Sequence, residues 1–366
     1  MLFIKIKEIF MKKLLVAAAM AALLLSTASA YNPPVGAEDL CLLSSPRALS
    51  GGLSVTGGAI FAAGAESIVV NPALTASSQR TNLNFGYTLL ATGNDVDEDK
   101  IGTAVQSAIM IPFKLYVFSG YVNGTFANFN EEMYLGNSVN GKIGLSKEIT
   151  DKLNVGASVS GGAAWKHGND WALGFNLGFL YNYGNLGFLR NFRYGASVLN
   201  LGKNYNNSDQ LFRPGINKES NAGEYPGLAT IKLGAAGSFV KNDNFELGAA
   251  LDFTVPAFQN LIVDMNLQAG IKNMLFLSIG EKFNVRETIE GHKAFIPSVG
   301  LIFNFTFDVK NNEYFAKKDW SQSEMIISAG YKNMYDKVNA ISAGLDVNLG
   351  MKDTSAPEII LIGMDE

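Results

Sequence analysis

Apolar and polar residues alternate with a period of two through most of the chain after residue 80. In residues 244–256, NFELGAALDFTVP, every second residue from Phe245 to Val255 is apolar, and the positions between them are mostly small or polar. Residues 171–183 and 260–271 repeat this pattern. Because successive side chains of a strand point to opposite faces, the pattern predicts β-strands with one apolar face.

Counting such stretches predicts about fourteen strands, an even number as in bacterial single-chain barrels. We expect them at 81–91, 102–111, 114–126, 132–147, 152–166, 170–183, 187–201, 227–240, 244–256, 260–271, 273–284, 293–308, 322–332 and 338–351. The third and seventh stretches alternate poorly.

Half-buried strands occur both in membrane-spanning barrels and in soluble β-sandwiches. The predicted strands extend over about 10–14 residues, which is longer than usual in soluble proteins and matches tilted membrane strands. Aromatic residues gather near strand ends, where a membrane barrel has its interfacial girdles, at Trp171, Tyr181, Tyr183, Tyr331 and Tyr335. The pattern favours an all-β fold, a fourteen-stranded antiparallel transmembrane β-barrel over residues 81–352, rather than an exported sandwich.

The lengths of the connections predict how the barrel is oriented. EITDK, YGN and KNDN are short and join even-numbered to odd-numbered strands, as periplasmic turns do. Long polar connections, such as residues 202–226, join odd-numbered to even-numbered strands and are expected outside. Residues 309–322 are long on the short-turn side and do not fit this scheme.

The first thirty residues have the pattern of an export signal. Met11-Lys12-Lys13 is a basic start, residues 14–25 are apolar, and Ala28-Ser29-Ala30 is a small-residue cleavage site. The apolar run is shorter than the roughly 20 residues of a membrane anchor. We expect translation from Met1 or Met11, cleavage near Ala30, and location in the outer membrane of a two-membrane bacterium.

Residues 31–80 are small and apolar and lack the alternation of membrane strands. A barrel of about fourteen strands lies between narrow barrels filled by side chains and wide aqueous pores, so its lumen needs an occupant. We expect residues 31–80 to form a hatch in the periplasmic mouth. Within it, Pro72 ends local hydrogen bonding and the Asn71 side chain can serve the backbone groups of a turn.

Two stretches resemble a known family. Residues 63–87, AGAESIVVNPALTASSQRTNLNFGY, resemble the junction between hatch and first strand in the FadL-type outer-membrane transporters. Their hatch carries an Asn-Pro-Ala motif, matched here by Asn71, Pro72 and Ala73, and their barrel has fourteen strands. Residues 194–203, YGASVLNLGK, are similar to a strand-end Asn-Leu-Gly signature of the related PorV-like proteins.

The resemblance implies passive uptake of hydrophobic molecules such as long-chain fatty acids, accompanied by hatch movement. In that family the ligand leaves sideways through a gap at a kinked early strand. Pro112, Gly120 and Gly124 mark either such a kink or ordinary strand-end irregularity. The implied partners are outer-membrane lipids, the hydrophobic ligand and the barrel-assembly machinery. The chain departs from the family at residues 353–366, which follow the last strand and are expected to be a periplasmic tail.

Composition and charge exclude several functions. The net charge is −4, and it becomes −7 without the four lysines and one glutamate of residues 1–30, which disfavours nucleic acid as a partner. The single cysteine, Cys41, rules out an internal disulfide framework and is expected to pack in the hatch. His167 and His292 fall in predicted loops away from clusters of metal-ligating residues. No catalytic or phosphate-binding motif is present, so we predict neither enzymatic activity nor a cofactor or metal.

Charged residues on the small and polar faces of the strands are expected to line the lumen. They are Lys142, Lys232, Glu246, Asp252, Asp264, Glu324 and Asp346. They either brace the interior of the barrel or contact a ligand, and a ligand with a carboxylate group would favour Lys142 or Lys232.

Two other functions fit an exported barrel. One is a PorV-like outer-membrane partner protein that anchors or shuttles secretion cargo. The other is a structural or adhesive surface barrel whose working part is the loop 202–226.

Overall fold

The protein is described from a computed structural model of residues 1–366. The structure describes residues 42–60, 63–78, 80–92, 101–127, 136–165, 169–203, 229–256, 260–285, 288, 297–308, 322–334 and 338–350. The export signal, Cys41, both histidines, Tyr335, residues 309–321 and the C-terminal tail lie outside these residues, as does residue 204 onward of the loop 202–226.

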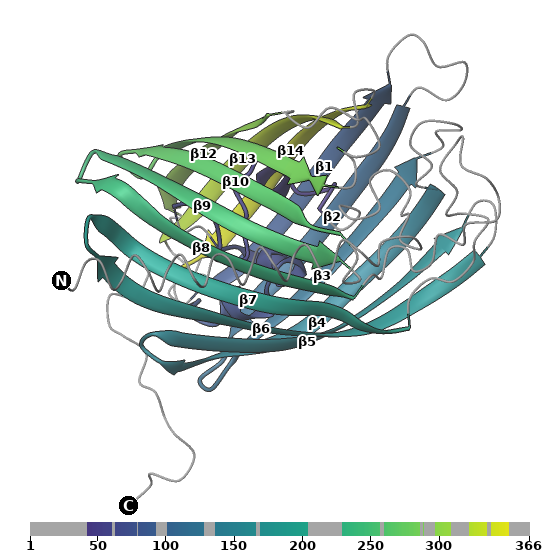
Figure 1. Ribbon diagram of the computed structural model, residues 1–366, viewed down its shortest axis with the longest axis horizontal. Coiled ribbons are helices and arrows are strands. Elements are labelled where there is room, and N and C mark those ends of the chain that lie inside the picture. Colours follow the sequence, from purple (N-terminus) through teal and green to yellow (C-terminus); the bar gives the residue numbers. More distant parts are fainter. Residues whose placement is uncertain are drawn as a thin grey trace, which may run out of the picture.

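Fourteen antiparallel strands form a closed barrel, in which each strand pairs with its neighbours in sequence and β1 pairs with β14 (Figure 1). The strands are β1 (Thr81–Thr92), β2 (Ile101–Pro112), β3 (Val117–Ala127), β4 (Gly136–Thr150), β5 (Leu153–Trp165), β6 (Asn169–Leu186), β7 (Leu189–Lys203), β8 (Thr230–Lys241), β9 (Phe245–Pro256), β10 (Ile262–Ile271), β11 (Leu275–Asn284), β12 (Ser298–Asp308), β13 (Gln322–Met334) and β14 (Val338–Leu349). The predicted fold class is confirmed.

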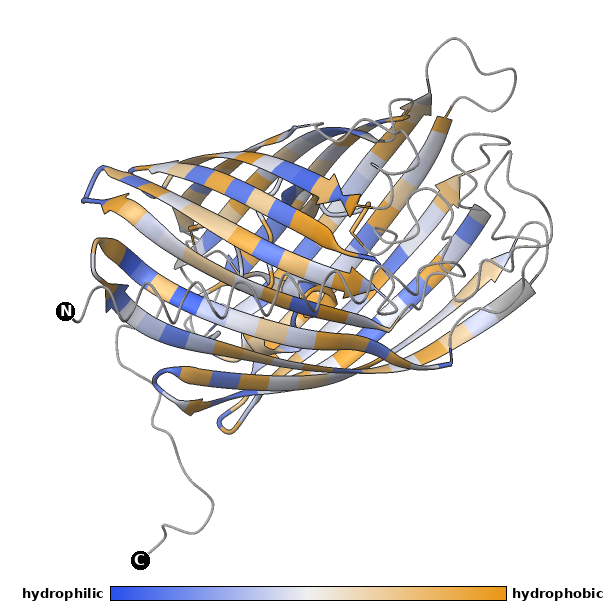
Figure 2. Cartoon of the chain, viewed as in Figure 1, coloured by the Kyte–Doolittle hydropathy of each residue, from blue (hydrophilic) through white to orange (hydrophobic). Residues whose placement is uncertain are grey.

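The alternation in the sequence separates the two faces of the wall. Hydrophilic and hydrophobic bands alternate along the strands (Figure 2). Large apolar side chains such as Leu173, Leu251 and Ile341 are exposed on the outside, whereas Asn176, Asp252 and Ser342 are buried on the inside. Exposed apolar side chains on every strand give the outer surface of a barrel that spans a membrane. In the described residues, no helix has both the length and the hydropathy needed to cross a bilayer.

The outer face also carries the expected aromatic residues. Trp171, Tyr183 and Tyr331 are exposed. Tyr181 stacks on Tyr194, with their ring centroids 5.2 Å apart. Aromatic side chains of this kind occupy the membrane interfaces of barrels.

Two of the predicted strand starts that differ from the structure have a local cause. Strand β3 begins at Val117 rather than residue 114, because residues 113–116 form a turn in which the Phe113 N–H donates to the Tyr116 carbonyl at 2.8 Å. Strand β12 begins at Ser298 rather than residue 293. Pro297 precedes it, and a proline has no N–H to donate to a ladder.

The irregularities of the wall lie away from the strand where a kink was considered. The ladders of β3 with β2 and with β4 run without a register shift. The ladder between β6 and β7 shifts at three places. At one of them Asn200 has a φ of 59° and its N–H donates to the Asn176 side chain at 2.7 Å. Asparagine tolerates this left-handed conformation, which explains why the Asn-Leu-Gly stretch lies at a bulge.

Residues 42–60, 63–78 and 80, here called the inner segment, lie within the barrel (Figure 1). They form α2 (Pro46–Leu49), η2 (Ala65–Val69) and η3 (Pro72–Thr75) and lead directly into β1. Nearly all of their side chains are buried. The inner segment therefore packs against the inward face of the strands, on the side where the small and polar residues lie.

Candidate functional site

The Asn-Pro-Ala motif caps a short helix inside the barrel. Asn71 is the N-cap of η3, and its side-chain oxygen accepts a hydrogen bond from the Ala73 N–H at 3.0 Å. Pro72 follows as the first helical residue, where its missing N–H leaves no bond unmade. The motif thus fixes one turn of helix without help from a neighbouring strand.

The Asn71 amide also ties the inner segment to the wall. Its nitrogen donates to the Val55 carbonyl at 2.8 Å and to the Phe179 carbonyl of β6 at 3.0 Å. Asn71 is fully buried, so water is not available to replace these bonds. One side chain therefore joins two parts of the inner segment to a membrane strand.

Glycines on the inward face make room for this contact. A Cβ on Gly178 of β6 would lie 2.0 Å from Asn71 Oδ1, and a Cβ on Gly156 of β5 would lie 2.3 Å from the Pro72 carbonyl oxygen. Side chains do not approach this closely, so glycine is required at both positions for the motif to dock. The sequence analysis singled out neither glycine.

We predict that Asn71→Asp weakens docking of the inner segment. The carboxylate still caps Ala73, but it places a second oxygen against the Val55 and Phe179 carbonyls and removes their donor. The expected cost is about 1–3 kcal/mol, because buried acceptors lose their partner. Hydrogen–deuterium exchange of the inner segment, followed by mass spectrometry, should become faster while exchange of the strands stays unchanged. Exchange equal to that of the wild type would contradict the role given to the Asn71 amide.

A buried ionic cluster forms a second attachment. Arg47 of α2 contacts the Glu66 carboxylate of η2, and its Nη2 lies 3.5 Å from Asp346 Oδ1 on β14. The exposed fractions of the Arg47 and Glu66 side chains are 3% and 0%. Such charges are stable in an interior only when they are paired, so this cluster couples the fold of the inner segment to the barrel wall.

The cluster continues into a chain of hydrogen bonds across three strands. Asn84 of β1 donates to Asp346 at 3.0 Å, and Gln106 of β2 donates to Asn84 at 2.7 Å. Ser44 of the inner segment completes the chain by donating to Gln106 at 3.0 Å. The polar inner wall is thus used to hold the inner segment.

The ionic cluster makes docking depend on pH. Burial raises the pKa of the Glu66 carboxyl from 4.5 to about 7; the Arg47 guanidinium acts against this shift and the Asp346 carboxylate adds to it. Between pH 4.5 and about pH 7, the Glu66 carboxyl is protonated in the docked segment but ionised in the undocked segment. Docking should therefore strengthen as the pH falls from 7 towards 4.5.

The measurement is the urea concentration at which proteinase K begins to cut the inner segment. We expect a higher concentration at pH 5 than at pH 7, and Glu66→Gln should reduce the difference. A urea concentration that is higher at pH 7 than at pH 5 would contradict the predicted direction of the pH dependence.

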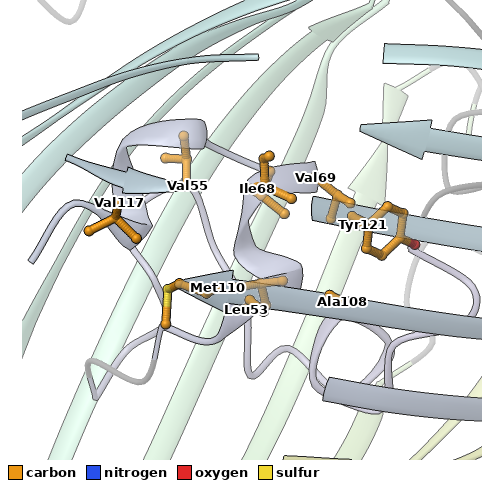
Figure 3. Packing of buried hydrophobic residues seen from close by; sticks show 10 residues of the cluster. Leu53, Val55, Ile68, Val69, Ala108, Met110, Val117 and Tyr121 are labelled. Carbon is orange, nitrogen blue, oxygen red and sulfur yellow. The ribbon is translucent and has the colours of Figure 1, made fainter. Parts of the chain in front are cut away.

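The third contact of the inner segment is apolar. Leu53, Val55, Ile68, Val69 and Val70 pack against inward-facing residues of β2 and β3 (Figure 3). The wall residues of this cluster are Ala108, Met110, Val117 and Tyr121. An apolar surface is therefore buried between the inner segment and one side of a largely polar lumen.

The predicted lumen residues face inward but do not form one group. Asp252 and Asp264 are direct partners on β9 and β10, and Lys282 lies opposite Asp264 on β11 with its Nζ 4.0 Å from the carboxylate. Asp252 also accepts a hydrogen bond from the Val55 N–H at 2.6 Å. Lys232 of β8 donates to Thr254 at 3.0 Å. These residues form a charged row across β8 to β11, which contacts the inner segment at Val55.

Two more of the predicted residues, Glu246 and Lys142, lie apart from this row. Glu246, near the start of β9, accepts from Ser238 and lies 3.2 Å from the Lys241 Nζ. Lys142 is buried on β4, where it lies opposite Tyr121 of β3 and Ser160 of β5 in the strand register. The predicted residues are thus distributed over at least two parts of the wall.

Comparisons with known proteins found similar solved structures but no similar sequence. No protein-family model and no curated protein sequence matches the chain. Among solved structures, the deltaS2 mutant of the monoaromatic hydrocarbon channel TodX matches with a TM-score of 0.52 and 12% identity, over 86% of this chain and all of that chain. The barrel has the TodX fold. The expected resemblance to FadL-type transporters is thereby confirmed at the level of fold.

Two further solved structures are similar to this chain. The toluene transporter TbuX of Ralstonia pickettii has a TM-score of 0.49 and 13% identity, over 83% of this chain and 99% of that chain. A FadL homologue of Pseudomonas aeruginosa has a TM-score of 0.46 and 11% identity, over 82% of this chain and 96% of that chain.

Two residues that attach the inner segment to the barrel were missed from the sequence. Arg47 and Arg193 carried no local signal, because their partners are distant in the chain. Arg193 of β7 donates to the Thr56 carbonyl at 3.0 Å and also bonds the Gly58 and Ala59 carbonyls. The poor alternation around β7, where the ladder to β8 shifts between Arg190 and Arg193, hid its inward position.

The described residues give no sign of a metal centre. Among them, no group of three or more His, Cys, Asp or Glu side chains is close enough to hold an ion. The conspicuous feature of the barrel interior is the docked inner segment.

Proposed function

We propose that the chain is an outer-membrane channel for passive uptake of hydrophobic small molecules, and that the inner segment is its hatch. The observation that carries the proposal is an apolar contact surface inside a closed barrel that has the fold of a hydrocarbon channel. The membrane location is supported by the apolar outer face.

The apolar cluster suggests where the ligand binds. Movement of the inner segment would uncover Val55, Ile68 and Val69 on one side and Met110 and Val117 on the other. Largely apolar, concave surfaces with a few polar groups are typical ligand sites. A hydrophobic molecule that enters the lumen would thus meet an apolar surface only where the hatch has moved.

The charged row suggests a class of ligand. Lys232 and Lys282 belong to the charged row whose Asp252 contacts Val55 of the hatch, and an ammonium group there would favour a ligand with a carboxylate and an alkyl chain. We therefore propose long-chain fatty acids as substrates, with uncharged hydrocarbons as a second class.

Binding to the purified full-length barrel tests the proposal. Radiolabelled oleate and radiolabelled toluene are titrated onto the protein in detergent, with glucose as the control solute. We expect saturable binding of at least one hydrophobic compound and none of glucose. A folded, heat-modifiable barrel that binds neither compound would contradict the transport proposal. That result would favour a role as a protein partner in secretion or in surface adhesion.

A further inference from the structure

A groove crosses the outer, membrane-facing wall of the barrel. It has a volume of about 540 Å³ and extends over β7 to β11. The outward residues of β8 and β9 that line it include the small Ala235, Gly237 and Ala249. Large apolar side chains of the neighbouring strands, including Phe239, Leu251 and Met265, form its sides.

The groove starts at aromatic residues and runs into the apolar band. Phe192 and Phe239 lie at its β7–β8 end, next to the short turns, where Phe192 packs edge-on against Tyr183 and Phe239 stacks on Phe188. Tyrosines of a barrel girdle lie at the level of the lipid headgroups. From there the groove continues to Leu267 and Ile279, whose side chains are exposed on the outer face.

The wall behind the groove is closed. Strands β7 to β11 are hydrogen-bonded to one another along this region. On the inner face, Ala59 of the inner segment packs against Ala236 and Ala250. A molecule in the groove therefore has to arrive from the membrane and not from the lumen.

We propose that this groove is a binding site for the acyl chain of a membrane phospholipid. Of the side chains that line it on the outer face, only that of Glu281 is polar, so an alkyl chain is the chemistry that fits. Its volume lies within the roughly 300–1,000 Å³ of ordinary ligand pockets. The site rests on the membrane location in the proposed function and does not depend on what the channel transports.

Photo-crosslinking tests the site. The full-length protein is reconstituted in vesicles of phosphatidylethanolamine and phosphatidylglycerol with a trace of phosphatidylcholine that carries a diazirine on its acyl chain. Crosslinked residues are mapped by mass spectrometry. We expect labelling concentrated on the strands β8–β10 around Ala235, Ala249 and Met265. Labelling spread evenly over the apolar band would overturn the proposal.

Substitutions that fill the groove with larger side chains can be compared with a control substitution elsewhere on the outer face. Ala235→Phe with Ala249→Phe should reduce labelling of these strands at least fivefold, whereas Ala343→Phe, on the exposed face of β14, should leave it unchanged. An equal reduction by both substitutions contradicts the site. If the paired variant does not fold, the crosslink map of the wild type decides the question alone.

Three further outcomes separate this site from the transport proposal. A diazirine-labelled fatty acid that marks the groove when the phospholipid does not would show a ligand site and overturn the lipid assignment. Unchanged oleate binding in the paired variant, together with lost lipid labelling, supports the proposal. Absence of oleate binding in the wild type bears on transport alone.

Discussion

Arg47→Ala should release the inner segment from the barrel wall. The substitution leaves Glu66 and Asp346 buried next to each other without the guanidinium between them. Removing one partner of a buried ionic cluster typically costs about 3–5 kcal/mol, which corresponds to a shift of more than a hundredfold towards the undocked state. Amide exchange of the peptides from 42 to 80 should accelerate accordingly, while the β-barrel remains heat-modifiable.

A second arginine provides the matched control. Arg80 also bridges the inner segment and the wall, with its Nη2 2.7 Å from Glu324, but both side chains are partly exposed. Partly exposed pairs contribute about 1 kcal/mol or less, so Arg80→Ala should change exchange only slightly. Equal effects of the two substitutions would show that burial of the Arg47 cluster is not what holds the segment.

Gly178→Val should prevent docking by steric exclusion. Its Cβ would lie 2.0 Å from Asn71 Oδ1 and 2.9 Å from Pro72 Cδ, so η3 has to move away and the Asn71 bonds are lost. Overpacking together with lost buried hydrogen bonds gives roughly 3–5 kcal/mol against the docked state. Valine favours a strand, so the ladder itself should persist. Ion conductance in planar lipid bilayers should rise well above that of the wild type.

Gly161→Val is the control for this experiment. Gly161 lies on β5, and the nearest atoms to its Cβ position are the Ala172 carbonyl oxygen at 3.7 Å and Leu173 Cδ1 at 4.0 Å. Its conductance should match that of the wild type. A Gly178→Val barrel that conducts no more than this control would mean that the lumen is not closed by the docked motif.

The alternation of the sequence was sufficient to predict the strands because it is a local property. A period of two identifies each strand and its membrane-facing side, and the fourteen strands and the inward position of Asp252 and Asp264 followed from it. The starts of β3 and β12 were wrong because a turn at Phe113–Tyr116 and Pro297 override the alternation there.

The attachment of the inner segment was not predictable in the same way. Asn71 was recognised through its motif, but its partners Val55 and Phe179 are distant in the chain. The cluster of Arg47, Glu66 and Asp346 depends on how a segment without periodicity folds inside the barrel. Only the three-dimensional path of that segment brings these charges together.

The most direct test of the account is transport by a barrel whose inner segment is stapled to the wall. Thr75 and Ser146 of β4 suit this purpose, because their hydroxyl oxygens are 2.8 Å apart, so Thr75→Cys with Ser146→Cys should form a disulfide. The pair is introduced together with Cys41→Ser and expressed in cells that lack other channels for hydrophobic compounds. The uptake of radiolabelled oleate and toluene is then measured before and after reduction. The account predicts uptake above that of empty cells by the reduced protein, and loss of this uptake when the staple is oxidised. Uptake at the level of empty cells, or equal uptake by the stapled and reduced forms, would contradict a hydrophobic-compound channel gated by its inner segment.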